Sequence, residues 1–173
     1  MGKNTPNGNI VLIGMPGAGK STLGVVLAKI LNKDFLDADL LIQKKCDATL
    51  QGIIDTEGPE AFIRLENSVL REIDVRDTVT ATGGSAVYSD EGMRHLGEIG
   101  TVVYLEISYE SLLERLCDLN ERGVVMRDGV GMGLQALYDE RVPLYETYAD
   151  IVVNVDNLSI TAAARKVAAC VSS

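Results

Sequence analysis

Short runs of apolar, β-branched residues alternate along the chain with longer stretches in which apolar residues recur every three or four positions. This alternation predicts buried strands separated by amphipathic helices. The predicted buried strands are 9–13, 78–82, 101–107 and 150–155, with a weaker fifth strand at 34–37. The predicted helices are 20–31, 59–75, 109–120, 133–148 and 160–171, with a shorter one at 40–46. The pattern favours an α/β fold with a central parallel sheet of five strands and helices on both faces.

Composition is consistent with one globular domain. The chain has 173 residues, of which 46% are hydrophobic and 24% are charged, and it contains no internal repeat or Pro/Ser-rich linker. We expect a flexible N-terminus at 1–8 and a single domain from 9 to 173. Residues 122–133 carry four glycines and two arginines between two predicted helices, which predicts a mobile lid.

Charge and hydropathy exclude several classes of partner. The formal net charge of -9 opposes binding to a polyanionic backbone, so we expect no nucleic acid partner. No apolar run approaches the roughly 20 residues that span a bilayer, and the polar N-terminus lacks the apolar core of a signal peptide. We therefore expect a cytoplasmic protein. We also expect it to act as a monomer.

The cysteines and the single histidine do not suggest a metal site. Cys46, Cys117 and Cys170 are far apart and form no Cys-x-x-Cys pair, so we expect reduced, mostly packed thiols rather than zinc ligands or disulfides. His95 follows Arg94 in a polar stretch and is expected at the surface.

Residues 14–21, Gly-Met-Pro-Gly-Ala-Gly-Lys-Ser, match the phosphate-loop consensus G-x-x-x-x-G-K-[ST] between a predicted strand and a predicted helix. We expect a solvent-facing Lys20 to reach the β- and γ-phosphates and the Ser21 hydroxyl to bind Mg²⁺. The predicted nucleotide contacts are Gly14, Gly17, Ala18, Gly19, Lys20, Ser21 and Thr22.

The nearest match to the guanine signature Asn-Lys-x-Asp is residues 32–35, where Phe35 stands in place of Asp. An ATP-dependent kinase of a small molecule is therefore favoured over a GTPase.

Two carboxylates, Asp37 and Asp39, end the predicted strand at 34–37, at the edge where ligands bind to such sheets. One carboxylate can hold Mg²⁺ and the other can accept a proton from an attacking hydroxyl group. Alternatively, Asp39 caps the helix that follows, although capping alone would not require Asp37.

Four motifs occur in the order found in shikimate kinases: the Gly-x-Pro-Gly-x-Gly-Lys-Ser loop, the strand end Phe-Leu-Asp-Ala-Asp at 35–39, the glycine-rich loop at 82–87 and Arg-Val-Pro-Leu-Tyr at 141–145. The chain resembles this family over about residues 9–171, including a substrate-side region at 37–66. The resemblance implies a P-loop kinase fold and the phosphorylation of shikimate to shikimate 3-phosphate with ATP and Mg²⁺.

The resemblance also implies a role for individual residues. Lys20 would stabilise the transferring phosphoryl group, Ser21 and Asp37 would serve Mg²⁺, and Asp39 would act as base. Arg122 would be the lid arginine that closes on the phosphates, and Arg115 would stack on adenine. The implied contacts to the acceptor are Asp39, Gly83, Gly84, Ser85 and Arg141.

The sequence departs from the family where the acceptor carboxylate would bind. Ile63 stands where the family has an arginine, and Ser85 replaces the third glycine of the loop. Arg64 or Arg127 are candidates to replace the missing cation. The departures leave open a kinase for another hydroxyl compound, such as homoserine or a sugar acid. An ATP-binding sensor without turnover is a further alternative.

Overall fold

The computed structural model describes residues 8–121 and 133–172, and the side chains within these ranges apart from 117–121. The predicted flexible N-terminus and the predicted lid lie outside these ranges except for Gly8 and Gly133. Arg122 and Arg127 also lie outside the described residues. The Cys117 side chain is not among those described.

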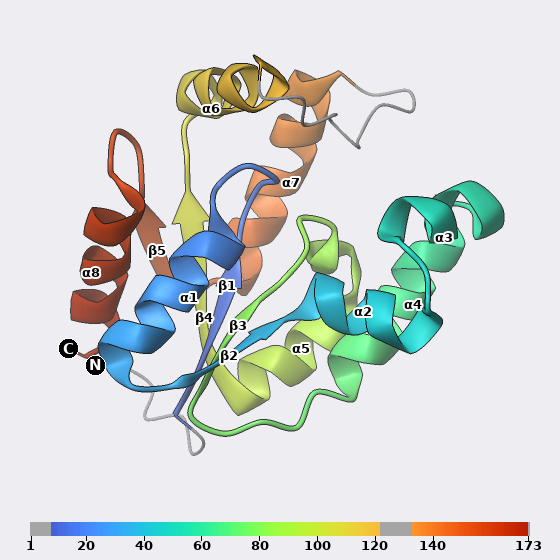
Figure 1. The fold of residues 1–173 in the computed structure, drawn as a ribbon, viewed down its shortest axis with the longest axis horizontal. Coiled ribbons are helices and arrows are strands. Elements are labelled where there is room, and N and C mark those ends of the chain that lie inside the picture. Colours follow the sequence, from blue (N-terminus) through green and yellow to red (C-terminus); the bar gives the residue numbers. More distant parts are fainter. Residues whose placement is uncertain (1–7, 122–132, 173) are drawn as a thin grey trace.

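A five-stranded, all-parallel sheet with helices on both faces forms the centre of the molecule (Figure 1), as predicted. In sequence order the strands are β1 (Asn9–Ile13), β2 (Asp34–Asp37), β3 (Thr78–Ala81), β4 (Gly100–Glu106) and β5 (Ile151–Asn154). Their spatial order is β2-β3-β1-β4-β5. The central strand β1 pairs with β3 and β4, so Val11 lies opposite both Thr80 and Val102. All five residues of β1 are buried, which explains its unbroken apolar run.

The edge strand β5 is more exposed than the pattern of hydrophobic residues suggested. Among the described residues β5 pairs with β4 alone, and Val152 is 49% exposed. The prediction that 150–155 is a buried strand was therefore wrong in its burial, although a strand does form there. A run of β-branched residues suits a strand in either position and does not distinguish centre from edge.

Helices α1 (Lys20–Leu31) and α8 (Ile160–Val171) pack against each other on one face of the sheet, whereas α5 (Asp90–Ile99) and α7 (Leu134–Tyr148) cover the other (Figure 1). Helix α6 (Tyr109–Glu121) follows β4. The remaining elements are α2 (Ala38–Cys46), α3 (Leu50–Glu57), α4 (Pro59–Arg71) and the short 3-10 helix η1 (Ala86–Tyr88).

Helices α2, α3 and α4 build a lobe with a small apolar core of its own. That core consists of Ile42, Leu50, Ile53, Phe62 and Val69. The lobe lies on the side of the molecule away from α1 and α8 (Figure 1). α2 follows β2 directly and contacts it, and α4 packs against both α3 and α5, so the lobe is attached to the sheet through β2 and α5.

Two helices, α3 and α5, were not predicted. α3 is only eight residues long. α5 contains Gly92 and Gly97, which lower its helix propensity. A Cβ at Gly92 would lie 2.8 Å from Leu70 Cβ, so this glycine allows close packing of α5 against α4. Gly92 thus makes this helix hard to predict from the sequence, and it is also required for the packing of the helix.

The cysteine and histidine environments differ in part from expectation. Cys46 is half-buried and Cys170 is exposed, and both are free thiols; the prediction of packed thiols was wrong for Cys170, which lies on the outer side of α8. His95 is half-buried on α5, where its Nε2 lies 2.8 Å from the Ile73 carbonyl oxygen. Within the described ranges, no helix is long and apolar enough to cross a membrane.

Asn9 joins the starts of three strands. Its buried side chain donates through Nδ2 to the carbonyl oxygens of Val75 (2.7 Å) and Ile99 (3.0 Å). Its Oδ1 accepts from the backbone N–H of Thr78 (3.1 Å). The amide group of Asn9 therefore provides hydrogen-bond partners for backbone groups before β3, at the start of β3 and before β4.

We predict that Asn9→Ala lowers the free energy of unfolding by on the order of 3 kcal/mol, because it leaves buried backbone groups without a partner. Gln135→Ala removes an exposed side-chain hydrogen bond to Asp139 on α7 and serves as the control, with an expected change below about 0.5 kcal/mol. Urea unfolding followed by circular dichroism measures both. Equal effects of the two substitutions would contradict the anchoring role of Asn9.

Candidate active site

The loop between β1 and α1 has a backbone that requires glycine. Gly14, Gly17 and Gly19 have φ angles of 146°, 86° and 90°, which other residues rarely adopt. A Cβ at Gly14 would also lie 2.8 Å from the Leu105 carbonyl oxygen. Gly19 caps α1 without a side-chain hydrogen bond, so the first backbone N–H groups of the helix are left for an anion.

Lys20 lies inside this loop. Its Nζ donates to the carbonyl oxygens of Gly14 (2.7 Å) and Met15 (2.9 Å), and only 7% of the residue is exposed. The expectation of a solvent-facing side chain was therefore wrong, because the loop curls around its own lysine. The ammonium group is held where the loop and the α1 N-terminus meet.

Ser21 and Asp37 lie next to each other. The Ser21 hydroxyl donates to Asp37 Oδ2 at 2.6 Å, which joins the start of α1 to the end of β2. Asp37 Oδ1 accepts from the backbone N–H groups of Asp39 (3.0 Å) and Leu40 (3.2 Å) and so caps α2. A hydroxyl and a carboxylate oxygen are ligands that Mg²⁺ accepts alongside water and phosphate oxygens.

The capping residue is Asp37 and not Asp39. α2 begins at Ala38, two residues earlier than predicted, and Asp39 stands in its first turn. A Cβ added to Gly83 would lie 2.7 Å from Asp39 Oδ1 and 2.9 Å from Glu66 Oε1. Two carboxyl groups, one from α2 and one from α4, therefore converge on the Gly83 backbone.

Glu66 is a buried acid at the point where these elements meet. It is 1% exposed; its Oε2 accepts from the Ser85 hydroxyl at 2.8 Å, and its Oε1 has no hydrogen-bond partner among the described atoms. Burial, with a further contribution from the negative charge of Asp39, raises the pKa of Glu66 to about 7, against the lowering effects of the Ser85 hydrogen bond, Arg141 and Lys20.

Arg141 approaches the same loop from α7. It is 7% exposed, its guanidinium carbon lies 5.3 Å from the centre of the Tyr88 ring, and its Nε donates to the Tyr88 hydroxyl at 3.3 Å. A Cβ at Gly84 would meet Arg141 Nη1 at 3.0 Å and Pro16 Cδ at 2.7 Å. The Tyr145 hydroxyl donates to the Gly84 carbonyl oxygen at 2.7 Å. The glycine-rich loop is thus held between the phosphate loop and α7.

Arg115 lies on the opposite side of the phosphate loop. Its guanidinium donates to the carbonyl oxygens of Ala18 (3.1 Å) and Val155 (2.9 Å). These bonds join α6 to the phosphate loop and to the end of β5. Thr22 is exposed in the first turn of α1, close in sequence to both Lys20 and the loop.

Arg64 is separated from the buried acid. It is exposed on α4 and lines an open hollow of about 250 Å³ whose other lining residues are Ile63, Asn67, Tyr88, Ser89, Asp90 and Glu91. Two residues along a helix correspond to about 200° of rotation, so Arg64 and Glu66 project from nearly opposite sides. Ile63 is half-buried and adjoins Tyr88 in this hollow.

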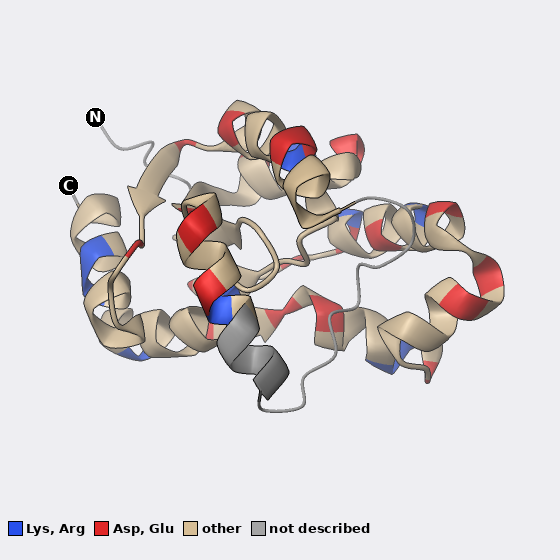
Figure 2. Ribbon diagram, turned by 90° about the horizontal axis from the view of Figure 1, so that it is seen from above, with Lys and Arg blue, Asp and Glu red and all other residues tan. Residues whose placement is uncertain are grey.

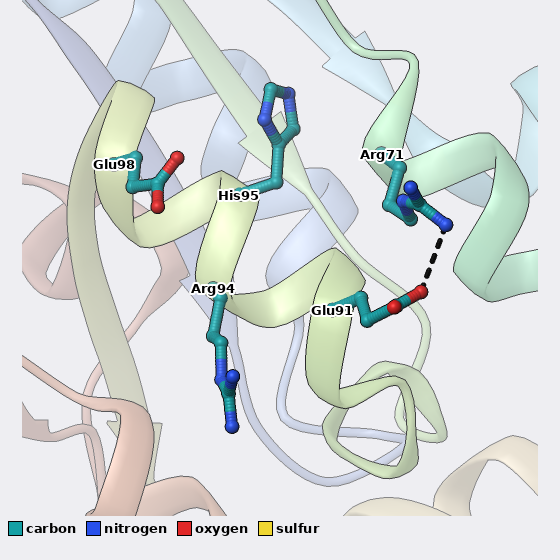
Figure 3. Close-up of a pocket in the computed structure, with 5 residues that line it drawn as sticks. All are labelled: Arg71, Glu91, Arg94, His95 and Glu98. Carbon is teal, nitrogen blue, oxygen red and sulfur yellow. Dashed lines mark hydrogen bonds and ion pairs between the residues drawn. The ribbon is translucent and has the colours of Figure 1, made fainter.

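A second hollow, of about 320 Å³, lies between α4 and α5 (Figure 3). Its arginines are engaged: Arg71 pairs with Glu91 at 2.8 Å, and Arg94 pairs with Asp90 at 2.8 Å. The phosphate loop does not contribute to its lining. We therefore place the candidate active site at the carboxyl ends of β1, β2 and β3.

Sequence reasoning missed Glu66, Tyr88 and Tyr145 as parts of this site. A signal for Glu66 was present, because it falls among the apolar positions Phe62, Val69 and Leu70 on the buried side of α4. A charged residue on an apolar helix face usually has a partner or a function. The two tyrosines come from η1 and α7, and no local pattern linked them to the loop.

Comparison with known proteins identifies close relatives. The family model described as shikimate kinase matches residues 16–172. The shikimate kinase of Francisella tularensis subsp. novicida (strain U112) is 42% identical over 154 residues, which cover 88% of each chain.

Solved structures agree with the sequence comparison. A shikimate kinase from Acinetobacter baumannii, solved in complex with shikimate, has a TM-score of 0.85 and 32% identity; the match covers 97% of this chain and 94% of the other. The shikimate kinase from Bacteroides thetaiotaomicron has a TM-score of 0.79 and 27% identity, over 95% of this chain and 98% of the other.

The raised pKa of Glu66 predicts a specific pH dependence of stability. Because the folded protein binds this proton more tightly than the unfolded chain, the contribution of Glu66 to stability is present below about pH 4.5 and is lost as pH rises through about 7. We expect Glu66→Gln to remove this loss. Between pH 4.5 and 8, the free energy of unfolding of the variant should therefore rise by about 3 kcal/mol relative to that of the wild type.

The measurement is urea unfolding at a series of pH values. Glu60→Gln, at an exposed position in the first turn of the same helix, is the control and should follow the wild-type curve. Parallel curves for Glu66→Gln and the wild type would show that Glu66 has the same pKa in the folded and unfolded protein, which would contradict the raised pKa.

Proposed function

The chain belongs to the shikimate kinase family, and we propose that it transfers the γ-phosphoryl group of ATP to the 3-hydroxyl group of shikimate. It is a phosphotransferase that acts on a hydroxyl group. The observation that carries the proposal is the meeting of a lysine-containing phosphate loop with Asp39, Gly83 and Arg141 at one edge of the sheet. That arrangement joins an anion site to an acid–base group and a cation for the acceptor.

The nucleotide side would use the loop between β1 and α1. Backbone N–H groups of the loop would bind phosphate oxygens, and Lys20 would stabilise charge on the transferring group. The proposed nucleotide contacts are Gly14, Gly17, Ala18, Gly19, Lys20, Ser21, Thr22 and Arg115. The in-plane hydrogen bonds of Arg115 leave the faces of its guanidinium plane for stacking on adenine.

Mg²⁺ would be held by Ser21 and Asp37, whose oxygen atoms are 2.6 Å apart. When bound, the ion neutralises charge on the β- and γ-phosphates and orients them. Asp37 also caps α2, and this bond fixes the direction of its other carboxylate oxygen. In the described residues no group of three or more His, Cys, Asp or Glu forms a closed metal site, consistent with an ion that retains water and phosphate ligands.

The acceptor side would lie over the glycine-rich loop. Asp39 would accept the proton of the attacking hydroxyl group, and the buried Arg141 would bind the carboxylate of shikimate. Gly83 and Gly84 allow close approach, because a side chain at either position would collide with Asp39 or Pro16. Ser85 would act through its hydrogen bond to Glu66. Arg64 is the remaining nearby cation on α4, and Arg122 stays a prediction outside the described residues.

Kinases of homoserine or a sugar acid are not favoured, because the relatives reported above, at 42%, 32% and 27% identity, are shikimate kinases. A sensor without turnover is disfavoured by Asp39, since nucleotide binding alone does not need an acid–base group beside the glycine-rich loop.

We further propose that the chain works as a single-domain, cytoplasmic monomer without nucleic acid or membrane partners. Lys and Arg are spread over several helices and interspersed with Asp and Glu (Figure 2). Together with the net charge of -9, this distribution provides little attraction for a polyanionic surface.

We predict that Lys20→Met lowers the rate of phosphoryl transfer by on the order of 100- to 1000-fold, because it removes the charge that stabilises the transition state. A coupled assay for ADP release in the presence of shikimate measures this rate. Lys29→Met, at an exposed position in the last turn of α1, is the matched control and should retain wild-type turnover. Wild-type turnover of Lys20→Met, with the fold intact by circular dichroism, would exclude the proposed mechanism.

Ile63→Arg tests the altered carboxylate site. A bidentate arginine contact to a carboxylate typically contributes about 1.5–3 kcal/mol, so we predict that the variant binds shikimate roughly 10- to 100-fold more tightly. Ser68→Arg adds the same charge to an exposed position on another side of α4 and should leave affinity unchanged. Calorimetric titration measures both. Unchanged or weaker binding by Ile63→Arg would show that residue 63 does not face the acceptor carboxylate.

A further inference from the structure

Glu66 is the buried ionisable group of this site to which the proposed reaction assigns no task. It projects from α4 toward the Gly83 backbone, where its unpartnered Oε1 lies near Asp39. Its other oxygen accepts from the Ser85 hydroxyl. With 1% exposure, the carboxyl group has no access to bulk water, so its charge must be balanced by neighbouring side chains.

The charged groups that act on Glu66 come from three elements. Asp39 on α2 opposes its ionisation, whereas Arg141 on α7 and Lys20 at the start of α1 favour it. α3 packs against α4 through Leu50 and Ile53, which are apolar.

The acid of α5 that contacts α4 is directed elsewhere. Glu91 accepts from Asn67 and pairs with Arg71, on a different side of α4 from Glu66. The ionisation state of Glu66 therefore depends on how far Arg141 and Lys20 remain available to it.

The anionic substrates of a kinase would bring negative charge to both Arg141 and Lys20. A carboxylate beside Arg141 would offset the positive field that favours ionised Glu66 and would itself repel a second negative charge. We propose that Glu66 enters the substrate complex as an uncharged carboxylic acid, so that binding of a carboxylate-bearing acceptor takes up about one proton. This inference rests on the proposed function, because it takes the acceptor to be shikimate.

The identity of residue 63 permits Glu66 to take up a proton when the acceptor binds. This residue lies one turn before Glu66 on the same side of α4, and as isoleucine it supplies no positive charge to hold Glu66 ionised. An uncharged Glu66 does not repel the acceptor carboxylate, whereas an ionised Glu66 would. Glu66 thus becomes a specificity-determining residue that favours anionic acceptors at or below neutral pH.

The decisive experiment is calorimetric titration of shikimate into the full-length protein at pH 8 in HEPES and in Tris, which differ in ionisation enthalpy. The dependence of the observed enthalpy on buffer gives the number of protons taken up. We expect about one for the wild type and about zero for Glu66→Gln, whose amide is uncharged and does not titrate. Glu60→Gln should behave as the wild type.

The affinity itself provides a second readout. Between pH 7 and 9 the wild-type dissociation constant should rise by up to about tenfold per pH unit, while that of Glu66→Gln stays constant. Shikimate binding without proton uptake, or with uptake that persists in Glu66→Gln, would overturn the inference and leave the proposed function intact. Absence of any shikimate binding at pH 6 would instead overturn the proposed function, and the inference with it.

A measurement on the wild type alone covers the case in which Glu66→Gln does not fold. With ¹³C-labelled glutamate, one side-chain carboxyl resonance should titrate near pH 7 in the free protein and at a higher pH in the shikimate complex. A full set of glutamate resonances that titrate below pH 6 in both states would contradict the inference.

Discussion

The position of β3 between β1 and β2 is the constraint on which the site depends. Because the three strands are parallel and adjacent, the segments that follow them leave the sheet at the same edge. These segments are the phosphate loop, residues 37–39 at the start of α2 and the glycine-rich loop at 82–87. They are distant in sequence, and the strand order brings the Ser21 hydroxyl to Asp37 and Asp39 to Gly83. The Asn9 amide reinforces the order at the opposite ends of the strands.

The site at this edge of the sheet also requires that charged side chains be buried. Lys20, Glu66 and Arg141 are each less than 8% exposed, and burial of charged groups is unfavourable unless they are paired or neutralised. Carbonyl oxygens hold Lys20, and the Tyr88 ring and hydroxyl hold Arg141. Among the described atoms Glu66 accepts a hydrogen bond from Ser85. Burial outweighs the lowering effect of this bond and raises the pKa of Glu66. A site with two buried cations beside Asp39 and an acid whose pKa is raised to about 7 is suited to anionic ligands.

Local patterns predicted the sheet and the phosphate loop well, because both are encoded in short segments. Strands β1 and β2 and helices α1 and α8 begin and end where the sequence suggested. The burial of Lys20 could not be predicted, since it results from the curvature of the loop around its own side chain. Helix α5 was missed because it contains Gly92 and Gly97, and Gly92 serves packing against Leu70. The role of Glu66 emerges only when α2, α4, α7 and the glycine-rich loop are assembled. Tertiary contacts therefore determine the acceptor side of the site far more than the nucleotide side.

Direct observation of the product tests the central claim most clearly. The purified protein is incubated with MgATP and shikimate, and the reaction is followed by ³¹P NMR with homoserine and gluconate as parallel acceptors. The account predicts that the γ-phosphate signal of ATP is replaced in equal amount by a phosphomonoester resonance coupled to the ring proton at carbon 3 of shikimate, with slower or no transfer to the other acceptors. Release of inorganic phosphate alone, or faster transfer to homoserine or gluconate, would contradict it.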